Sequence, residues 1–251
     1  MKLIHQEQTE HHDISVWDTA ELYGERGRFR ILQFSEDAVQ GAVDLDRPER
    51  ILFEYPRAMI HLMEYNQPEF EKIFMIGHGI GTIANYLPDR SVVTAELDAG
   101  VVEISRQWFG SRTDHVIIGD GRLILEQEED ESLDYLLLDA FSADGTPGHL
   151  VSDAFFTMVY SKLVPGGAVL MNLAGRTRYD HTISSVYTTL QSVFPYTTAF
   201  LLPSSTGMDI RNYLLAGSMS PLRYQSRHLA GFEEIHLQPG LILTDEAPPH
   251  A

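Results

Sequence analysis

The chain has 251 residues, enough for one large domain or for a main domain with a small appendage. Its 36 acidic and 18 basic residues give a formal net charge of −18, which argues against nucleic acid or an anionic membrane as a partner. The absence of cysteine excludes disulfides, thiolate nucleophiles and thiolate metal sites. We expect a cytoplasmic protein, because residues 1–18 contain no secretory apolar segment and no apolar run reaches the roughly 18 to 20 residues of a membrane span.

Residues 1–65 alternate short β-prone runs with turns that contain Gly, Asp and Pro. The runs are HDISVWD, RFRILQF, AVQGAVDL and RILFEY. This pattern is typical of antiparallel strands joined by tight turns. It predicts a small N-terminal antiparallel β lobe over residues 1–65, beside a main domain over residues 66–251.

The main domain begins with five short and nearly all-apolar runs, KIFMIG, SVVTAEL, HVIIGD, LDYLLLDAF and AVLMNLAG. Such runs are typical of parallel strands buried on both faces, and segments with helical spacing, such as residues 179–194, separate the runs of this domain. Two last runs, YTTAFLLP and NYLLAGSM, follow each other without a helix and predict a terminal antiparallel hairpin. The alternation predicts a doubly wound, mostly parallel, seven-stranded sheet. This is the Rossmann-like plan of the S-adenosylmethionine-dependent transferases.

Three glycines, Gly77, Gly79 and Gly81, follow the first of these strands, and Glu96 ends the second about 20 residues later. Glycines at a strand-to-helix turn let the backbone approach a ligand, and the helix N-terminus offers free N–H groups. A carboxylate at the end of the next strand can accept hydrogen bonds from both hydroxyls of a ribose. The glycines alone would also suit a tight turn with positive φ. Together with Glu96 they predict a nucleoside site.

Asp120 ends the third strand in IIGDGRLIL. Its carboxylate can accept from an adenine amino group, although Asp is also a preferred residue at a helix N-cap. The carboxyl ends of three successive strands then converge on one nucleoside, where open α/β sheets bind ligands. No residue pattern here suits a pyrophosphate. We therefore predict an adenosine with a sulfonium arm as the ligand, and we predict no metal site.

Asp139 ends the fourth strand, in LLLDAFSADGTPGHL, and should face the arm of such a nucleoside. An amine acceptor is protonated at neutral pH and must lose a proton before its nitrogen attacks carbon. A carboxylate can hold the ammonium, orient it and take that proton. The structural alternative for Asp139 is a cap or turn residue. The loop 143–149 that follows is either a lid that excludes water or an ordinary loop.

In the order and spacing of its motifs, the chain resembles the spermidine synthase family, the polyamine aminopropyltransferases, over roughly residues 28–220. The motifs are AVQGAV, FEYPRAM, IGHGIGT, AELD, GDGR, LLLDAF and PGGAVLMN. The resemblance implies transfer of an aminopropyl group from decarboxylated S-adenosylmethionine to a polyamine-like amine, in a homodimer, with Asp139 as the general base. It implies that the nucleoside and its arm contact Gln40, Gly77, Gly79, Gly81, Glu96, Asp120, Gly121, Pro147 and Leu150. It implies that the amine contacts Tyr55, Ser142 and Asp144.

The chain departs from the family's pattern at three points. Ile80 stands in the glycine loop where the family usually carries an Asp that contacts the donor's amino group. Ser142 stands where a second Asp usually follows the base by three residues, and the late loop LPSSTGMD lacks an acceptor-contacting Tyr. The stretches DAFSADGTPGHL and LTDEAPP resemble those of divergent bacterial spermidine synthase-like proteins. Loss of a buried charged partner costs on the order of 2 to 5 kcal/mol, so the identity of the acceptor stays open.

Three functions therefore remain open from the sequence. Asp139 favours aminopropyl transfer, because that reaction needs only positioning and deprotonation of an amine. Ile80 favours an S-adenosylmethionine-dependent methyltransferase on the same fold, because an uncharged residue accommodates the carboxylate of the intact donor more easily. The third possibility is a non-catalytic module that binds the nucleoside. Asp139 argues against it, since a pure binder does not need that carboxylate.

Overall fold

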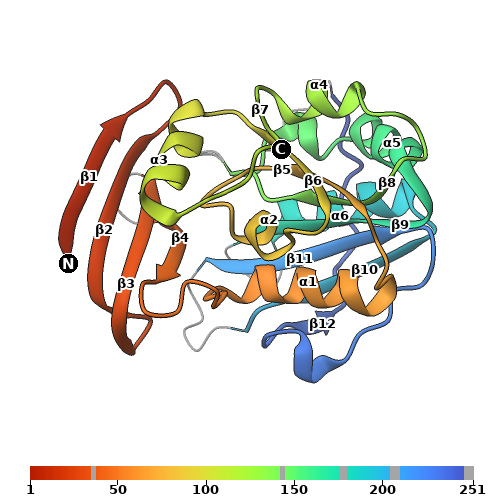
Figure 1. Ribbon diagram of the computed structural model, residues 1–251. Coiled ribbons are helices and arrows are strands. Elements are labelled where there is room, and N and C mark those ends of the chain that lie inside the picture. The colour runs from red at the N-terminus through yellow and green to blue at the C-terminus, as the bar shows by residue number, and fades with distance from the viewer. Residues whose placement is uncertain (35–37, 142–144, 176–179, 204–209, 246–251) are drawn as a thin grey trace.

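The computed structural model describes residues 1–34, 38–141, 145–175, 180–203 and 210–245, and these form two β-sheets. Figure 1 shows the smaller, N-terminal sheet beside the larger sheet and its helices. The smaller sheet has the order β1-β2-β3-β4, and its neighbouring strands all pair antiparallel, which confirms the predicted N-terminal lobe. Its strands are β1 (Lys2–Gln8), β2 (Asp13–Leu22), β3 (Glu25–Phe34) and β4 (Ala38–Asp44).

Two details of the smaller sheet differ from the prediction. Strand β1 was not predicted, because its side chains are mostly exposed and give no alternation of apolar and polar residues. The run RILFEY is not a strand, since the sheet ends at Asp44 and helix α1 (Glu54–Asn66) begins inside the run. Pro56 lies in the first turn of α1, where its missing N–H costs no hydrogen bond.

The larger sheet has the order β12-β10-β11-β9-β8-β5-β6-β7. Strands β5 to β9 pair parallel, and β10, β11 and β12 pair antiparallel, so the predicted parallel sheet with a terminal hairpin is confirmed. The sheet has an eighth strand, β12, whose three residues include two glutamates and therefore form no apolar run. The strands are β5 (Lys72–Ile76), β6 (Ser91–Glu96), β7 (Val116–Ile118), β8 (Leu133–Leu138), β9 (Leu163–Gly175), β10 (Tyr196–Leu201), β11 (Arg211–Ser218) and β12 (Glu233–Ile235).

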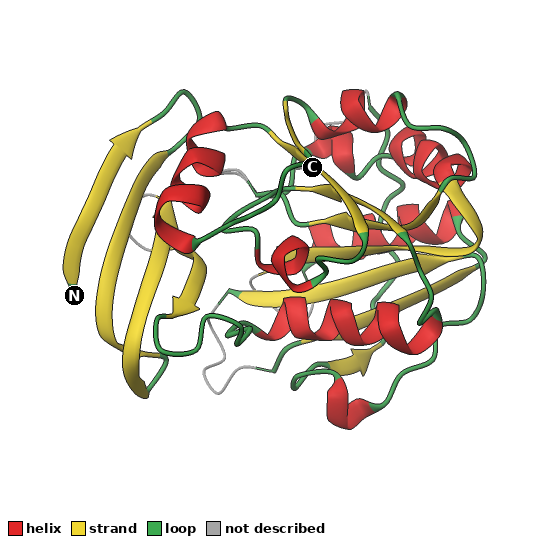
Figure 2. Cartoon of the chain, viewed as in Figure 1, coloured by secondary structure: helices red, strands yellow, loops and turns green. Residues whose placement is uncertain are grey.

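Helices cover both faces of the larger sheet, as Figure 2 shows. On β8, Tyr135 and Leu137 pack on the face covered by α1, while Leu136 and Leu138 pack on the face covered by α5 and α6. Burial on both faces explains why the central strands β5 and β8 are almost entirely apolar. The remaining helices are α2 (Thr82–Tyr86), α3 (Ala99–Phe109), α4 (Gly121–Glu126), α5 (Asp153–Lys162) and α6 (His181–Val193). Among the described residues, no helix is both long and apolar enough to cross a bilayer.

The smaller sheet packs against the rest of the molecule through an apolar cluster. Ile14 and Leu32 of the sheet meet Ile104 of α3, and α3 lies beside this sheet in Figure 1. Helix α1, which the predicted division at residue 65 assigns to the first unit, packs on the larger sheet through Met59 and Leu62. The division itself stays a prediction.

Candidate functional site

The glycine loop runs from the end of β5 into α2 and is held close to β8. Gly77 has a φ of 99°, and a Cβ added to it would lie 2.1 Å from the carbonyl oxygen of Asp139. Only glycine fits this conformation and this approach. A Cβ at Gly79 would meet no atom within 4 Å, and Gly81, with a φ of 78°, begins α2. The loop therefore brings the ends of β5 and β8 together and leaves space beside Gly79.

Glu96 ends β6 and is bonded directly to the glycine loop. One carboxylate oxygen accepts the backbone N–H of His78 at 2.8 Å, and the other accepts the N–H of Asp98 at 3.0 Å. The residue is only 8% exposed. Burial raises the pKa of Glu96, and these two N–H groups oppose the rise. The predicted meeting of the glycine loop with a carboxylate at the next strand end is therefore present.

Asp120 follows β7 and caps the N-terminus of α4, which is the other role that the sequence allowed for it. Its Oδ1 accepts the N–H groups of Arg122 at 2.9 Å and Leu123 at 3.1 Å. Its Oδ2 lies 2.8 Å from Nε2 of His149, which belongs to the short 3₁₀ turn Gly148–Leu150. Capping uses one oxygen only. The second oxygen stays on the accessible side, where a base amino group could replace or join His149.

Gly121 explains how α4 sits so close to β5. A Cβ at this position would lie 2.4 Å from Cγ2 of Ile76, the last residue of β5. Pro147 is half-buried just before the 3₁₀ turn, and Leu150 is 3% exposed within the main core. The segment that carries Pro147 and His149 therefore lies over the end of β7 and is anchored by Leu150.

A segment near the C-terminus reaches the same strand end. Both carboxylate oxygens of Asp245 pair with the guanidinium of Arg122, at 2.7 and 2.8 Å, and Arg122 also donates to the carbonyl of His149 at 2.9 Å. The Arg122 guanidinium lowers the pKa of Asp245 to about 2, helped by Ser152. Leu243, just before, is buried in the core. The ion pair of Arg122 with Asp245 therefore links the C-terminal segment to the residues that flank Asp120.

Asp139 follows β8 and meets side chains from two other elements. Nδ2 of Asn172, on β9, donates to its Oδ1 at 2.9 Å, and the hydroxyl of Tyr55, on α1, also donates to the carboxylate. Burial raises the pKa of Asp139, while Asn172 and Tyr55 oppose the rise and favour the ionised form. Burial and the charge of Asp139 raise the pKa of Tyr55 well above its usual value. The structure therefore brings together Tyr55 and Asp139, which are distant in sequence and which were each predicted to contact the amine.

Two asparagines beside Asp139 were missed by the sequence analysis. Asn172 is 2% exposed, and Asn212 on β11 donates to its Oδ1 at 2.8 Å. The available signal for Asn172 was a polar residue inside the apolar run AVLMNLAG. Asn212 stands near the start of its strand, where a polar residue is unremarkable, and gave no signal.

Gln40 occupies an irregular position on β4. Strand pairing joins Leu32 to Gly41 and Gln33 to Val39, so Gln40 is the extra residue of a β-bulge. Bulges re-aim side chains and are frequent beside functional sites. The next residue, Gly41, lies against the glycine loop. The structure thus brings the predicted Gln40 to the same region, while Ser142 and Asp144 lie outside the described residues.

Ile80 and His78 of the glycine loop both point away from its open side. A Cβ at Gly41 would lie 2.6 Å from Cγ2 of Ile80, and Ile80 is 7% exposed in the apolar cluster with the smaller sheet. The His78 ring is 5% exposed, its Nε2 lies 2.9 Å from Oγ of Ser105, and burial lowers its pKa to about 4. Ile80 therefore packs the lobe against the loop, and His78 anchors the loop to α3.

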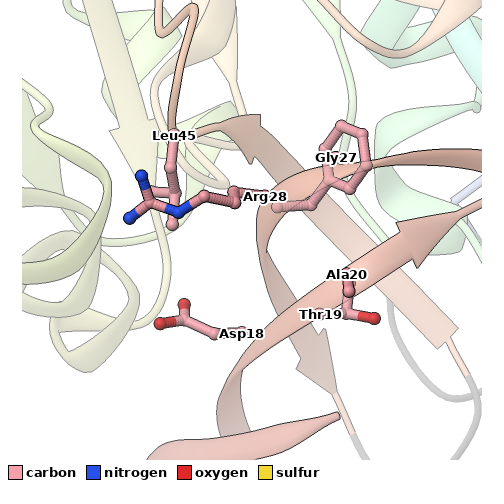
Figure 3. Close-up of a pocket in the computed structure, with 7 residues that line it drawn as sticks. Asp18, Thr19, Ala20, Gly27, Arg28 and Leu45 are labelled. Atoms are coloured by element: carbon pink, nitrogen blue, oxygen red, sulfur yellow. The ribbon is translucent and has the colours of Figure 1, made fainter.

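A separate hollow lies in the smaller sheet. It measures about 240 Å³ and contains none of the predicted site residues. Figure 3 shows the residues that line it, which come from β2, β3 and the position after β4: Asp18, Thr19, Ala20, Gly27, Arg28, Phe29 and Leu45.

Comparison with known proteins agrees with this arrangement of motifs. Residues 52–216 match the family model of the spermine/spermidine synthase domain. A polyamine aminopropyltransferase of Vibrio vulnificus is 27% identical, over 98% of this chain and 82% of that protein. Putrescine N-methyltransferase 2 of Nicotiana tabacum is 24% identical, over 77% of this chain and 54% of that protein.

The fold also has a solved counterpart. The crystal structure of a probable spermidine synthase from Corynebacterium glutamicum superimposes with a TM-score of 0.75 at 21% identity, over 90% of this chain and 83% of that one. At this identity the likeness concerns the fold. The family model, in contrast, matches well over half of the sequence, and the chain therefore belongs to the spermine/spermidine synthase family.

Proposed function

We propose that this chain is a transferase that moves an aminopropyl group from decarboxylated S-adenosylmethionine to an amine. The observation that carries the proposal is the Asp139 carboxylate, which follows strand β8 and accepts hydrogen bonds from Tyr55 and Asn172. Family membership and the name of the Vibrio vulnificus relative support it.

Asp139 is proposed to act as the general base. The donor supplies a sulfonium-bound carbon, at which the bond to the acceptor nitrogen forms while the C–S bond breaks and its electron pair goes to sulfur. The acceptor must present a free lone pair, so its ammonium first gives a proton to Asp139. Burial raises the pKa of Asp139, which makes the carboxylate a better proton acceptor than an exposed one. Its position beside the glycine loop would also align the amine with the donor carbon.

The other strand ends are proposed to hold the nucleoside. The oxygens of Glu96 accept the backbone N–H groups of His78 and Asp98, and their remaining lone pairs would accept from the ribose hydroxyls. Oδ2 of Asp120 would accept the adenine amino group, and Pro147 and Leu150 would pack near the base. Gln40, at the bulge of β4, would approach the arm.

The proposal is tested by a competition assay read by mass spectrometry. Purified protein receives equal amounts of S-adenosylmethionine and its decarboxylated form, together with a mixture of diamines and polyamines. We expect one amine to gain an aminopropyl group, which would also name the acceptor. Gain of a methyl group would assign the chain to methyl transfer instead. Tight binding of a nucleoside without any product would favour the non-catalytic alternative.

We also propose a homodimer in the cytoplasm, as the family resemblance implies. Sedimentation velocity at several protein concentrations would test the oligomeric state. A species with the mass of one chain at every concentration would contradict it.

A further inference from the structure

Asp139 is the end of a row of three hydrogen-bonded side chains on three neighbouring strands. Asn212 on β11 donates to Oδ1 of Asn172 on β9 at 2.8 Å, and Nδ2 of Asn172 donates to Oδ1 of Asp139 after β8 at 2.9 Å. These strands are adjacent in the sheet, in the order β11-β9-β8. Asn172, the middle member, is 2% exposed, so water does not substitute for either partner.

The direction of the Asn172 amide decides whether a hydrogen-bond donor or an acceptor faces the carboxylate of Asp139. An asparagine side chain offers an NH₂ donor on one side and a carbonyl acceptor on the other, and a rotation of about 180° exchanges them. With the NH₂ toward Asp139, the carboxylate accepts a hydrogen bond. With the carbonyl toward Asp139, two acceptors face each other and the ionised carboxylate is disfavoured.

Asn212 distinguishes between these two directions. In the direction that the Asn212 amide adopts here, its Nδ2 donates to Oδ1 of Asn172. With Asn212 in this direction, reversal of Asn172 would break its hydrogen bonds on both sides, placing NH₂ against NH₂ at Asn212 and carbonyl against carboxylate at Asp139.

We propose that Asn212 is a positioning residue that locks the Asn172 amide with its NH₂ group toward Oδ1 of Asp139. The inference rests on the proposed function, in which Asp139 takes the proton of the amine. Two consequences follow. The carboxylate is held in one direction, and its ionised form is favoured despite burial. Within the described residues, Tyr55 is the titratable side chain that faces Asp139, and it donates to the carboxylate from α1.

The test compares three variants, Asn212→Ala, Asn172→Leu and the double variant, all of which add no charge near Asp139. The first readout is the acid limb of kcat/KM against pH. We expect Asn172→Leu to move this limb upward by on the order of one pH unit, because Asp139 loses its donor. Asn212→Ala should move it upward by a smaller amount, about half a unit, because Asn172 then samples both directions. The double variant should match Asn172→Leu alone, since Asn212 acts through Asn172.

A second readout does not need turnover. Selective ¹³C labelling of aspartate carboxyl groups, with Asp139→Asn to assign the signal, gives the titration of Asp139 by NMR. The same order of shifts is expected. If the wild-type chain makes no aminopropyl product, the proposed function fails, while the titration still decides the role of Asn212.

Asn66→Ala is the matched control, because Asn66 also donates from a side-chain amide to two carbonyls, those of Leu62 and Arg223, at 2.8 Å each. It should lower the Tm without moving either titration. If Asn172→Leu does not fold, Asn172→Ala takes its place. The proposal is overturned if Asn212→Ala leaves the titration of Asp139 unchanged, or if the shifts of the two single variants add in the double variant.

Discussion

Glu96 and Asp139 both end parallel strands of the larger sheet, yet different kinds of partner hold their carboxylates. Main-chain N–H groups of His78 and Asp98 bond Glu96. Side chains of Tyr55 and Asn172 bond Asp139. Asp120 resembles Glu96 at its Oδ1, which two main-chain N–H groups bond, while its Oδ2 meets the side chain of His149.

We propose that this difference separates a nucleoside half of the site, around Glu96 and Asp120, from an acceptor half around Asp139. A main-chain N–H persists when the residue that carries it is replaced, so the nucleoside half depends on the path of the backbone. The acceptor half depends on the identity of a few side chains from distant elements. It can therefore change its substrate through few substitutions, and the following variants challenge this distinction.

The largest effect is expected from Asp139→Asn. An amide cannot take a proton from the ammonium, so kcat should fall by on the order of 10² to 10⁴-fold. Calorimetry should find the affinity for the nucleoside nearly unchanged, because Glu96 and Asp120 are intact. Equal loss of turnover and affinity would show that the two halves are not separate.

Gly77→Ala tests the dependence of the nucleoside half on the backbone. The new Cβ would collide with the carbonyl of Asp139 in a positive-φ conformation, and we expect a loss of about 3 kcal/mol in the free energy of unfolding. Gly79→Ala is the matched control, since its Cβ would enter open space at a φ of 53° and should cost only about 1 kcal/mol. Urea unfolding of both variants measures the difference. Similar losses would mean that conformation, and not close approach, selects Gly77.

Glu96→Gln should weaken the nucleoside specifically. A neutral amide places an NH₂ group against the N–H of His78 or Asp98 and loses charge-assisted bonds to the ribose, each worth about 1.5 to 3 kcal/mol. The dissociation constant should rise at least about tenfold, while kcat at saturating donor should change little. An unaltered dissociation constant would remove Glu96 from the nucleoside site.

The smallest effect is expected from Asp245→Asn, which loses the ion pair with Arg122. The folded-state pKa of Asp245, about 2, is below its ordinary value, so the pair stabilises the fold fully above about pH 4 and loses this contribution as the pH falls toward 2. The side chain is 42% exposed, so the stabilisation should stay below about 1 kcal/mol. The difference in Tm between the variant and the wild type should shrink toward zero as the pH is lowered from 5 to about 2. A constant difference over this range would mean that the carboxylate does not act through its charge.

More of the nucleoside half than of the acceptor half could be predicted from the sequence, because the residues of the nucleoside half lie close together along the chain. Gly77 and Glu96 are local signals, because a strand end, a turn and the next strand end lie within one stretch of chain. The pairing of Tyr55 with Asp139 came from the family resemblance. Asn172 and Asn212 become partners only when β9 and β11 lie side by side, and no local pattern predicts that pairing.

The same limit applies to the fold. Apolar composition predicted the buried strands β5, β6, β8, β9, β10 and β11, and it also predicted the edge strand β7, whose Ile117 and Ile118 are exposed. Strand β1 is mostly exposed, and β12 has only three residues, two of them glutamates. The β-prone run RILFEY ends in the first residues of helix α1, because that helix packs on the larger sheet. In each case tertiary contacts outweighed local preference.

The ion pair between Arg122 and Asp245 also sets an order of events during synthesis. The two residues are 123 positions apart. At about 5 to 20 residues per second, a ribosome adds Asp245 roughly 6 to 25 s after Arg122. Until then the ion pair of Arg122 with Asp245, beside His149 and α4, cannot form, although all the residues predicted to contact the nucleoside have already been synthesised. A released chain that is truncated before residue 245 should therefore bind the nucleoside more loosely than the full chain, because His149 and α4 then lack this ion pair.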